Sequence, residues 1–175
     1  MKSNLFLKKL VFFYGLFLLL NINATAQGVE RWSIKTLRDS GYKNVNFNNP
    51  INTTVKDLNF IVRPNKIKVS TSRLEEENYV FIIECKILEC LKQDDGDYHL
   101  IVCDLKQPEF KMIVEVITPK HGNLIFYNKF KKVRDFVTNK IRTRKIIGYN
   151  FTITGVAFFD LVHNQKGKSL NCIEL

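Results

Sequence analysis

Carboxylate and imidazole side chains near the C-terminal end of the sequence could carry chemistry. Asp160 is followed three residues later by His163, and Glu174 comes shortly after them. A carboxylate beside an imidazole can orient a general base or a metal ligand, but such a pair more often forms a hydrogen-bonded structural clasp at the end of a barrel. Asp160, His163 and Glu174 are therefore the candidate catalytic residues, and the clasp is the favoured interpretation for His163.

A second group of acidic residues surrounds an Asp-Gly turn. Asp95 and Asp97 lie in the turn, and His99 and Asp104 follow. Carboxylate oxygens are the ligands that Ca²⁺ and Mg²⁺ prefer, although this spacing is not that of an EF-hand and Asp-Gly sequences are mostly plain turns. Asp95, Asp97 and Asp104 are the candidate metal ligands. A metal-assisted hydrolase, such as a phosphodiesterase or nuclease, would draw on them and on Glu115, Asp160 and His163.

Basic residues are concentrated between positions 120 and 145. This segment holds nine basic residues against the single acid Asp135, a net charge of +8. Such a segment suggests binding to a polyanion, either nucleic acid, an anionic glycan or the cell envelope, although a solvated helix face would have the same composition. The candidate ligand-binding residues are Lys129, Lys131, Lys132, Arg134, Lys140, Arg142, Arg144 and Lys145.

Local motifs of nucleophilic and nucleotide-dependent enzymes do not occur in the sequence. It contains no Gly-x-Ser-x-Gly, no His-Glu-x-x-His and no P-loop. The leading hypothesis is therefore a non-enzymatic binding domain without a cofactor. The alternatives are the metal-assisted hydrolase and a structural domain that docks a protein partner.

Residues 1–26 have the three parts of a cleavable signal peptide. Lys2, Lys8 and Lys9 precede an apolar run at 10–20, and Ala24-Thr25-Ala26 gives a small-x-small cleavage site. The sequence thus predicts export to the periplasm or the medium. The predicted mature chain, 27–175, has 24 basic and 17 acidic residues once those three lysines are removed from the 27. It contains no later apolar run long enough to span a membrane.

The elements that must position these residues follow from hydrophobic patterning. Residues 27–76 form an irregular lead-in with short helices at 30–39 and 53–61. Strands are predicted at 79–91, 98–105 and 110–117, an amphipathic helix at 124–141, and two further strands at 151–161, with a bulge at Gly155, and at 172–175. The order β-β-β-α-β-β within 77–175 predicts a mainly β (α+β) fold, an OB-fold-like five-stranded barrel. Another small α+β sandwich is the alternative.

Four cysteines remain in the predicted mature chain: Cys85, Cys90, Cys103 and Cys172. In an oxidising compartment they could form two disulfides, or they could be free buried thiols. A turn at 94–97 places Cys90 opposite Ile101, so that Cys90 and Cys103 are expected on one face of the first hairpin.

The sequence resembles a family of small exported bacterial proteins over nearly all of the mature chain. The resemblance implies a bacterial exported domain and assigns no activity. Family members typically end in Asn-Gly-Ile-Glu-Leu-His-Pro-Val, whereas Cys172 stands here in place of the Gly and the sequence stops at Leu175, which suggests a truncated last strand. The matching residues are Glu30, Arg31, Lys35, Thr36, Thr53 to Val55, Asp95 to Leu100, Asp104, Met112, Ile113, Glu115, Thr154 to Val156, Phe158 to Asp160, His163, Asn171 and Ile173 to Leu175.

Overall fold

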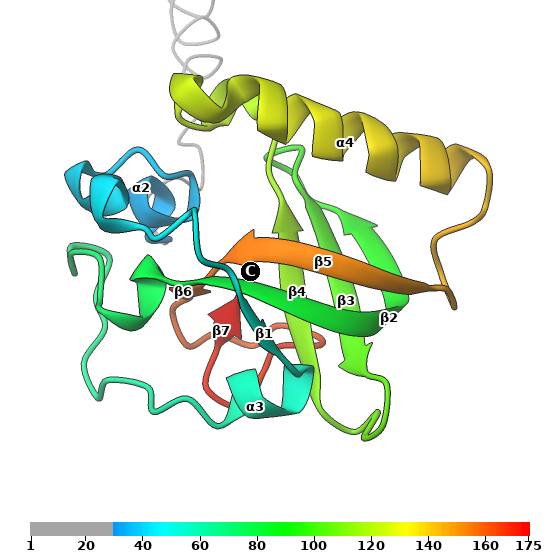
Figure 1. The fold of residues 1–175 in the computed structure, drawn as a ribbon, viewed down its shortest axis with the longest axis horizontal. Coiled ribbons are helices and arrows are strands. Elements are labelled where there is room, and N and C mark those ends of the chain that lie inside the picture. The colour runs from blue at the N-terminus through cyan, green and yellow to red at the C-terminus, as the bar shows by residue number, and fades with distance from the viewer. Residues whose placement is uncertain (1–29) are drawn as a thin grey trace, which may run out of the picture.

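The computed structural model describes residues 30–175, which form a curled half-barrel sheet of mixed strands with a few helices (Figure 1). The predicted signal peptide lies outside the described residues. The helix α4 (Tyr127–Arg142) lies along one side of the sheet and the short helix α3 (Val55–Asn59) lies at the opposite side. The strands are β1 (Ile51–Thr53), β2 (Val80–Lys92), β3 (Tyr98–Asp104), β4 (Lys111–Val116), β5 (Asn150–Val156), β6 (Phe158–Phe159) and β7 (Ile173–Glu174).

The strand β2 organises the sheet because each of its halves has different neighbours. Its first half is buried at alternate positions, as in Ile83, Cys85 and Ile87, and pairs with β5 and, in parallel, with β1. From Cys85 onward it pairs with β3, with a register shift between Ile87 and Glu89. An extra residue of this kind bends the strand and increases its twist. The predicted long, bending first strand is confirmed, whereas β1 was not predicted.

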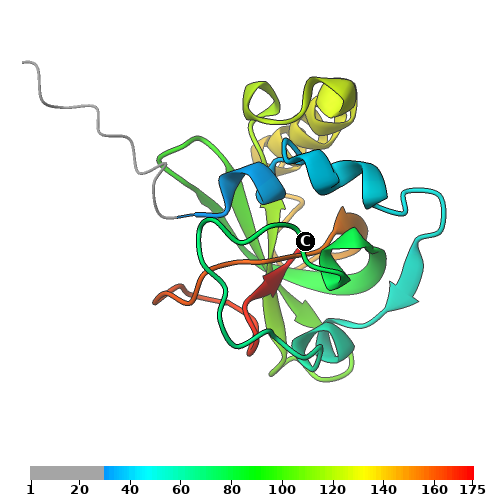
Figure 2. The same cartoon turned by 90° about the vertical axis from the view of Figure 1, so that its left-hand side faces the viewer.

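The C-terminal residues connect the two ends of the curled sheet. The strand β7 pairs with β6, which continues the line of β5. Beyond β7, the Leu175 carbonyl accepts a hydrogen bond from the Glu115 amide of β4 at 2.7 Å, and the Leu175 amide donates to the Ile113 carbonyl at 3.3 Å. Figure 2, which shows the curl from the side, places β7 inside the bend of the sheet.

Gly155 does not form the predicted bulge, because it pairs regularly with Phe81 across β5 and β2. Its lack of a side chain instead allows Leu175 to approach the strand. A Cβ at Gly155 would lie 2.9 Å from the Leu175 Cβ, which is closer than real Cβ contacts. Cys172, at the position where the resembled family has Gly, adopts a φ of 56°, in the left-handed region that favours glycine.

All four cysteines are free, and three of them are buried. The expectation that Cys90 and Cys103 share a face is wrong. Cys90 pairs with Leu100 and Cys103 pairs with Lys86, so the two thiols lie on opposite faces of the hairpin. The cause is the turn, which takes five residues (93–97) instead of the predicted four, so that Lys92 and not Gln93 pairs with Tyr98. Burial raises the pKa of the Cys85 thiol to about 12.

The helix α4 confirms the predicted amphipathic helix, but its apolar stripe is only partly covered. Val137 is buried, whereas Val133 and Phe136 are 51% and 50% exposed. The helix therefore stands off the sheet instead of packing tightly against it. Among residues 30–175, no helix has both the length and the apolar character needed to cross a membrane.

The part of the lead-in that the structure describes is tied to the sheet by a buried ion pair. The helix α2 (Trp32–Lys35) is shorter than the predicted 30–39 helix, and Arg31 lies directly before it. The Arg31 guanidinium donates to the carboxylate of Glu77 and to the carbonyl of Phe159 in β6, and neither charged side chain is exposed. Glu77 in turn accepts the amide of Phe159 at 2.8 Å.

Candidate functional site

The ammonium group of Lys35 is surrounded by carboxylates from three segments. Its Nζ lies 3.1 Å from Glu115 of β4, 3.5 Å from Asp97 of the Asp-Gly turn and 3.5 Å from Glu30, and it is 3.9 Å from Asp95. The side chain of Lys35 is 3% exposed. Burial alone would lower its pKa, but Glu115, Glu30 and Asp97 raise the pKa above its usual value. We call this group the Lys35 cluster.

His99 connects the Lys35 cluster to the loop between β6 and β7. Its Nε2 lies 2.8 Å from a Glu115 oxygen, and its Nδ1 lies 3.0 Å from the side-chain nitrogen of Gln165. A neutral ring that donates from Nε2 and accepts at Nδ1 satisfies both contacts. Both ring nitrogens are thereby engaged, and the arrangement fixes the loop against β3.

Glu174 is buried close to the same charges. It is 1% exposed, and neither of its carboxylate oxygens has a hydrogen-bond partner among the described residues. Burial, together with the nearby carboxylates of Glu115 and Asp160, raises the pKa of Glu174 well above its usual value of 4.5. Burial also raises the pKa of Asp160.

The Asp160–His163 pair has the geometry of the expected clasp. The His163 Nδ1 lies 2.8 Å from the Leu161 carbonyl and 3.3 Å from an Asp160 oxygen. The ring does not reach a partner in β7, and the side chain is 43% exposed. His163 therefore closes its own loop, and Glu174 is not part of this clasp.

The predicted metal ligands are not brought together. Asp95 and Asp97 join the Lys35 cluster, whereas Asp104 accepts backbone amides from Lys56, Lys106 and Gln107 at 3.1, 2.9 and 3.1 Å. Partial burial alone would raise the pKa of Asp104, but these hydrogen bonds lower it below its usual value. Within residues 30–175, no three His, Cys, Asp or Glu side chains are arranged to hold a metal ion.

Replacing Glu174 with Gln should stabilise the protein at neutral pH. A folded-state pKa raised above 4.5 means that the folded protein holds a proton which the unfolded chain releases, so wild-type stability falls as pH rises above 4.5. The Gln side chain removes this penalty, and we expect a gain of about 1–3 kcal/mol at pH 7 that disappears below the unfolded-state pKa. Urea unfolding across pH tests this, with exposed Glu109→Gln as the control. A constant difference between wild type and Glu174→Gln at all pH values would contradict it.

The predicted basic residues have different environments. Arg134 is structural: its guanidinium donates to the carbonyls of Val116 and Gly96 and lies 3.6 Å from the ring centre of Tyr98. Lys131 pairs with Asp135 at 2.6 Å. Among the described residues, the basic side chains of this segment that form no ion pair with an acid are Lys120, Lys129, Lys132, Arg134, Lys140, Arg142, Arg144 and Lys145.

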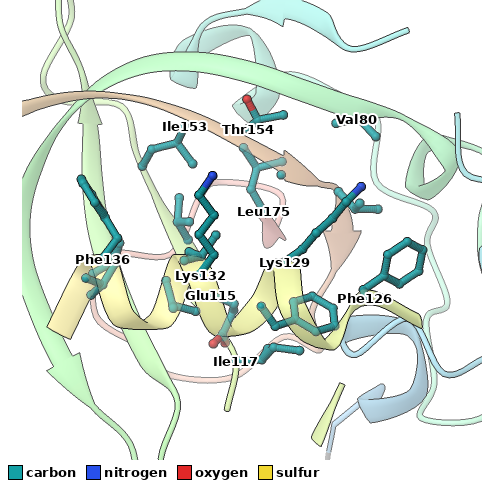
Figure 3. A pocket seen from close by; sticks show the side chains of 18 of the residues that line it. Val80, Glu115, Ile117, Phe126, Lys129, Lys132, Phe136, Ile153, Thr154 and Leu175 are labelled. Atoms are coloured by element: carbon teal, nitrogen blue, oxygen red, sulfur yellow. The ribbon is translucent and has the colours of Figure 1, made fainter. Parts of the chain in front are cut away.

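A cavity of about 670 Å³ separates α4 from the sheet. Phe136, Val137 and Phe130 line it from the helix, and Ile153 and Val156 line it from β5. Figure 3 shows Lys129 and Lys132 extending from α4 toward β5 across this space, between Phe126 and Phe136. The exposed part of the α4 stripe therefore faces a cavity.

Sequence reasoning missed both the central lysine and the cavity. Lys35 and Glu30 are among the residues that carry the resemblance, but no role was predicted for them. The signal that could have marked them was this match of charged residues in a mostly irregular segment. The cavity had a weaker signal: the apolar stripe of the 124–141 helix is flanked by lysines at positions 129 and 132.

Comparison with protein-family models, curated proteins and solved structures finds no match to this chain.

Proposed function

We propose that this protein is an exported, non-enzymatic binding domain with an OB-like barrel, and that it binds an extended polyanion through exposed basic residues of α4 and of the loop after it. The proposal has three parts: export, barrel and ligand. Export rests on the predicted signal peptide and on the resemblance to exported bacterial proteins. The other two parts draw on the arrangement of strands and of charges.

The order in which the strands pair supports an OB-like barrel. The strand β2 pairs with β3, β3 pairs with β4, and β4 is hydrogen-bonded to Leu175 just after β7. The strand β7 pairs with β6, which continues β5, and β5 pairs with β2. This cycle of five strand positions, with α4 between the third and the fourth, is the connectivity of an OB-fold.

The observation that carries the ligand proposal is the exposed basic surface at the end of α4. Arg142, Arg144 and Lys145 are exposed and have no acidic partner among the described residues. Lys131, about three turns before Arg142 on the helix, is also exposed. Unpaired positive charges on one surface attract a polyanion and release its counterions on binding.

The hydrolase hypothesis has less support from the geometry. Asp95, Asp97 and Glu115 do converge, but they converge on the ammonium group of Lys35. The buried ammonium group of Lys35 already occupies the centre of these carboxylates, the position that a metal ion would need. The protein-docking hypothesis has no specific observation in its favour.

Polyanion binding should weaken when the exposed charges are removed. For Lys131→Gln/Arg142→Gln/Arg144→Gln/Lys145→Gln we expect loss of binding to heparin and to oligodeoxythymidine, measured by fluorescence anisotropy at several salt concentrations. For oligodeoxythymidine, each lost phosphate contact should reduce the slope of log affinity against log salt by about 0.7. Fold stability should change little because all four side chains are exposed.

The matched control removes four exposed lysines from the α3 side of the molecule: Lys66, Lys68, Lys106 and Lys111. Both quadruple variants lose the same net charge. A purely global charge effect would weaken binding equally in the two, and this result would contradict the proposed surface. The absence of wild-type binding to either probe at low salt would overturn the polyanion proposal.

A further inference from the structure

The cavity beneath α4 is a feature that polyanion binding leaves unused. Its volume of about 670 Å³ lies in the range of small-molecule sites, about 300–1,000 Å³. Its walls are mostly apolar and come from both elements, with Val133 and Phe136 from α4 and Ile153 from β5. Val133 and Phe136 are about half exposed, so an apolar occupant would bury surface that the protein itself leaves open.

Positive charge is placed at one side of this cavity. Lys129 and Lys132 both line it, are exposed, and form no ion pair among residues 30–175. The Lys129 ammonium lies about 6 Å from the ring centres of Phe47 and Phe126, at 6.0 and 5.8 Å. Figure 3 shows both lysines reaching across the space from the helix. Two ammonium groups above an apolar space complement an anionic group attached to an apolar body.

The remaining polar lining sets the orientation of such a ligand. Glu115 and Lys35 are also lining residues. The Lys35 ammonium is already shared by Glu115, Glu30 and Asp97, and the other Glu115 oxygen has no hydrogen-bond partner among the described residues. A second negative charge beside this carboxylate would be repelled, whereas an apolar chain carries no such cost. The anionic group is therefore expected at Lys129 and Lys132, with the chain between α4 and β5.

We infer that the cavity between α4 and β5 is a binding site for a single-chain anionic amphiphile, a long-chain carboxylate, whose head is held by Lys129 and Lys132. The inference is independent of polyanion binding, because it uses the cavity and not the exposed surface of Arg142, Arg144 and Lys145. The ligand is recognised by its head charge and by the fit of its chain.

Fluorescence titration with dansyl-labelled undecanoic acid tests the site. We expect saturable enhancement of the dansyl emission by the wild-type protein and displacement by dodecanoate. Dodecanol, which has the same chain and no charge, should compete about tenfold less well or worse, since a charge-assisted hydrogen bond is worth about 1.5–3 kcal/mol. Equal competition by the acid and the alcohol would overturn the assignment of the head group to the lysines.

Two variants separate this inference from the polyanion proposal. Lys129→Gln/Lys132→Gln should weaken dodecanoate binding about tenfold or more while dodecanol competition stays unchanged. The quadruple variant at Lys131, Arg142, Arg144 and Lys145 should bind dodecanoate as the wild type does. Ile153→Trp, which fills the cavity from β5, should weaken both the acid and the alcohol. Absence of saturable probe binding by the wild type, or unchanged dodecanoate affinity in the double variant, would overturn the inference.

Discussion

Replacing Arg31 with Met should destabilise the fold by about 3–5 kcal/mol, the cost of removing one partner of a buried ion pair. The substitution leaves the Glu77 carboxylate without its counter-charge in a fully buried position. It also removes donors to the carbonyls of Phe159, Ser72 and Thr71. Glu77→Gln leaves the opposite charge unpaired and should cost a similar amount. Urea unfolding gives both values.

The exposed Arg38 of the same segment supplies the control, and Arg38→Met should leave stability nearly unchanged. In Arg31→Met/Glu77→Leu neither charge remains, so the loss should be smaller than the sum of the single losses. It should not vanish, because Glu77 also accepts the amides of Leu74 and Phe159. A loss below about 1 kcal/mol in both single variants would show that the pair does not hold the lead-in to the sheet.

Replacing Lys35 with Met should produce a second large loss of stability, again about 3–5 kcal/mol at neutral pH. Met has a similar length and no charge, so Glu115, Asp97 and Glu30 would face one another without the ammonium group that separates them. In the wild type the raised pKa of Lys35 contributes stability that is complete below its usual value of 10.5 and is lost as pH rises through the folded-state pKa.

The pH dependence distinguishes lost charge pairing from lost packing. As pH falls, the carboxylates around position 35 become protonated, and the difference between wild type and Lys35→Met should shrink. Lys166→Met removes a surface ion pair with Glu89 and is the matched control, with little effect expected. A loss in Lys35→Met that is the same at pH 4 and pH 8 would contradict the electrostatic explanation.

Local patterns determined most of the elements of this protein. Alternation predicted β2, the Asp-Gly turn predicted the hairpin, and the change to a helical period predicted α4, because each of these signals depends on residues close together in the chain. The sequence did not predict β1, whose three residues pair with β2 from a segment that looks irregular. It also missed the bulge near Leu88 and the five-residue length of the turn, and the turn length reversed the relation between Cys90 and Cys103.

For the candidate sites, too, the sequence identified individual residues, whereas the tertiary structure decided which of them lie together. The sequence alone identified Asp95, Asp97, Glu115 and Glu174 as carboxylates of interest and located the basic segment. Only the tertiary structure decided that the first three surround Lys35, that Asp104 accepts an amide of α3, and that α4 stands away from β5 over a cavity. The physical reason is that burial, pairing and the space between elements depend on contacts between residues far apart in the chain, such as Lys35 with Glu115, which local propensity and periodicity do not encode.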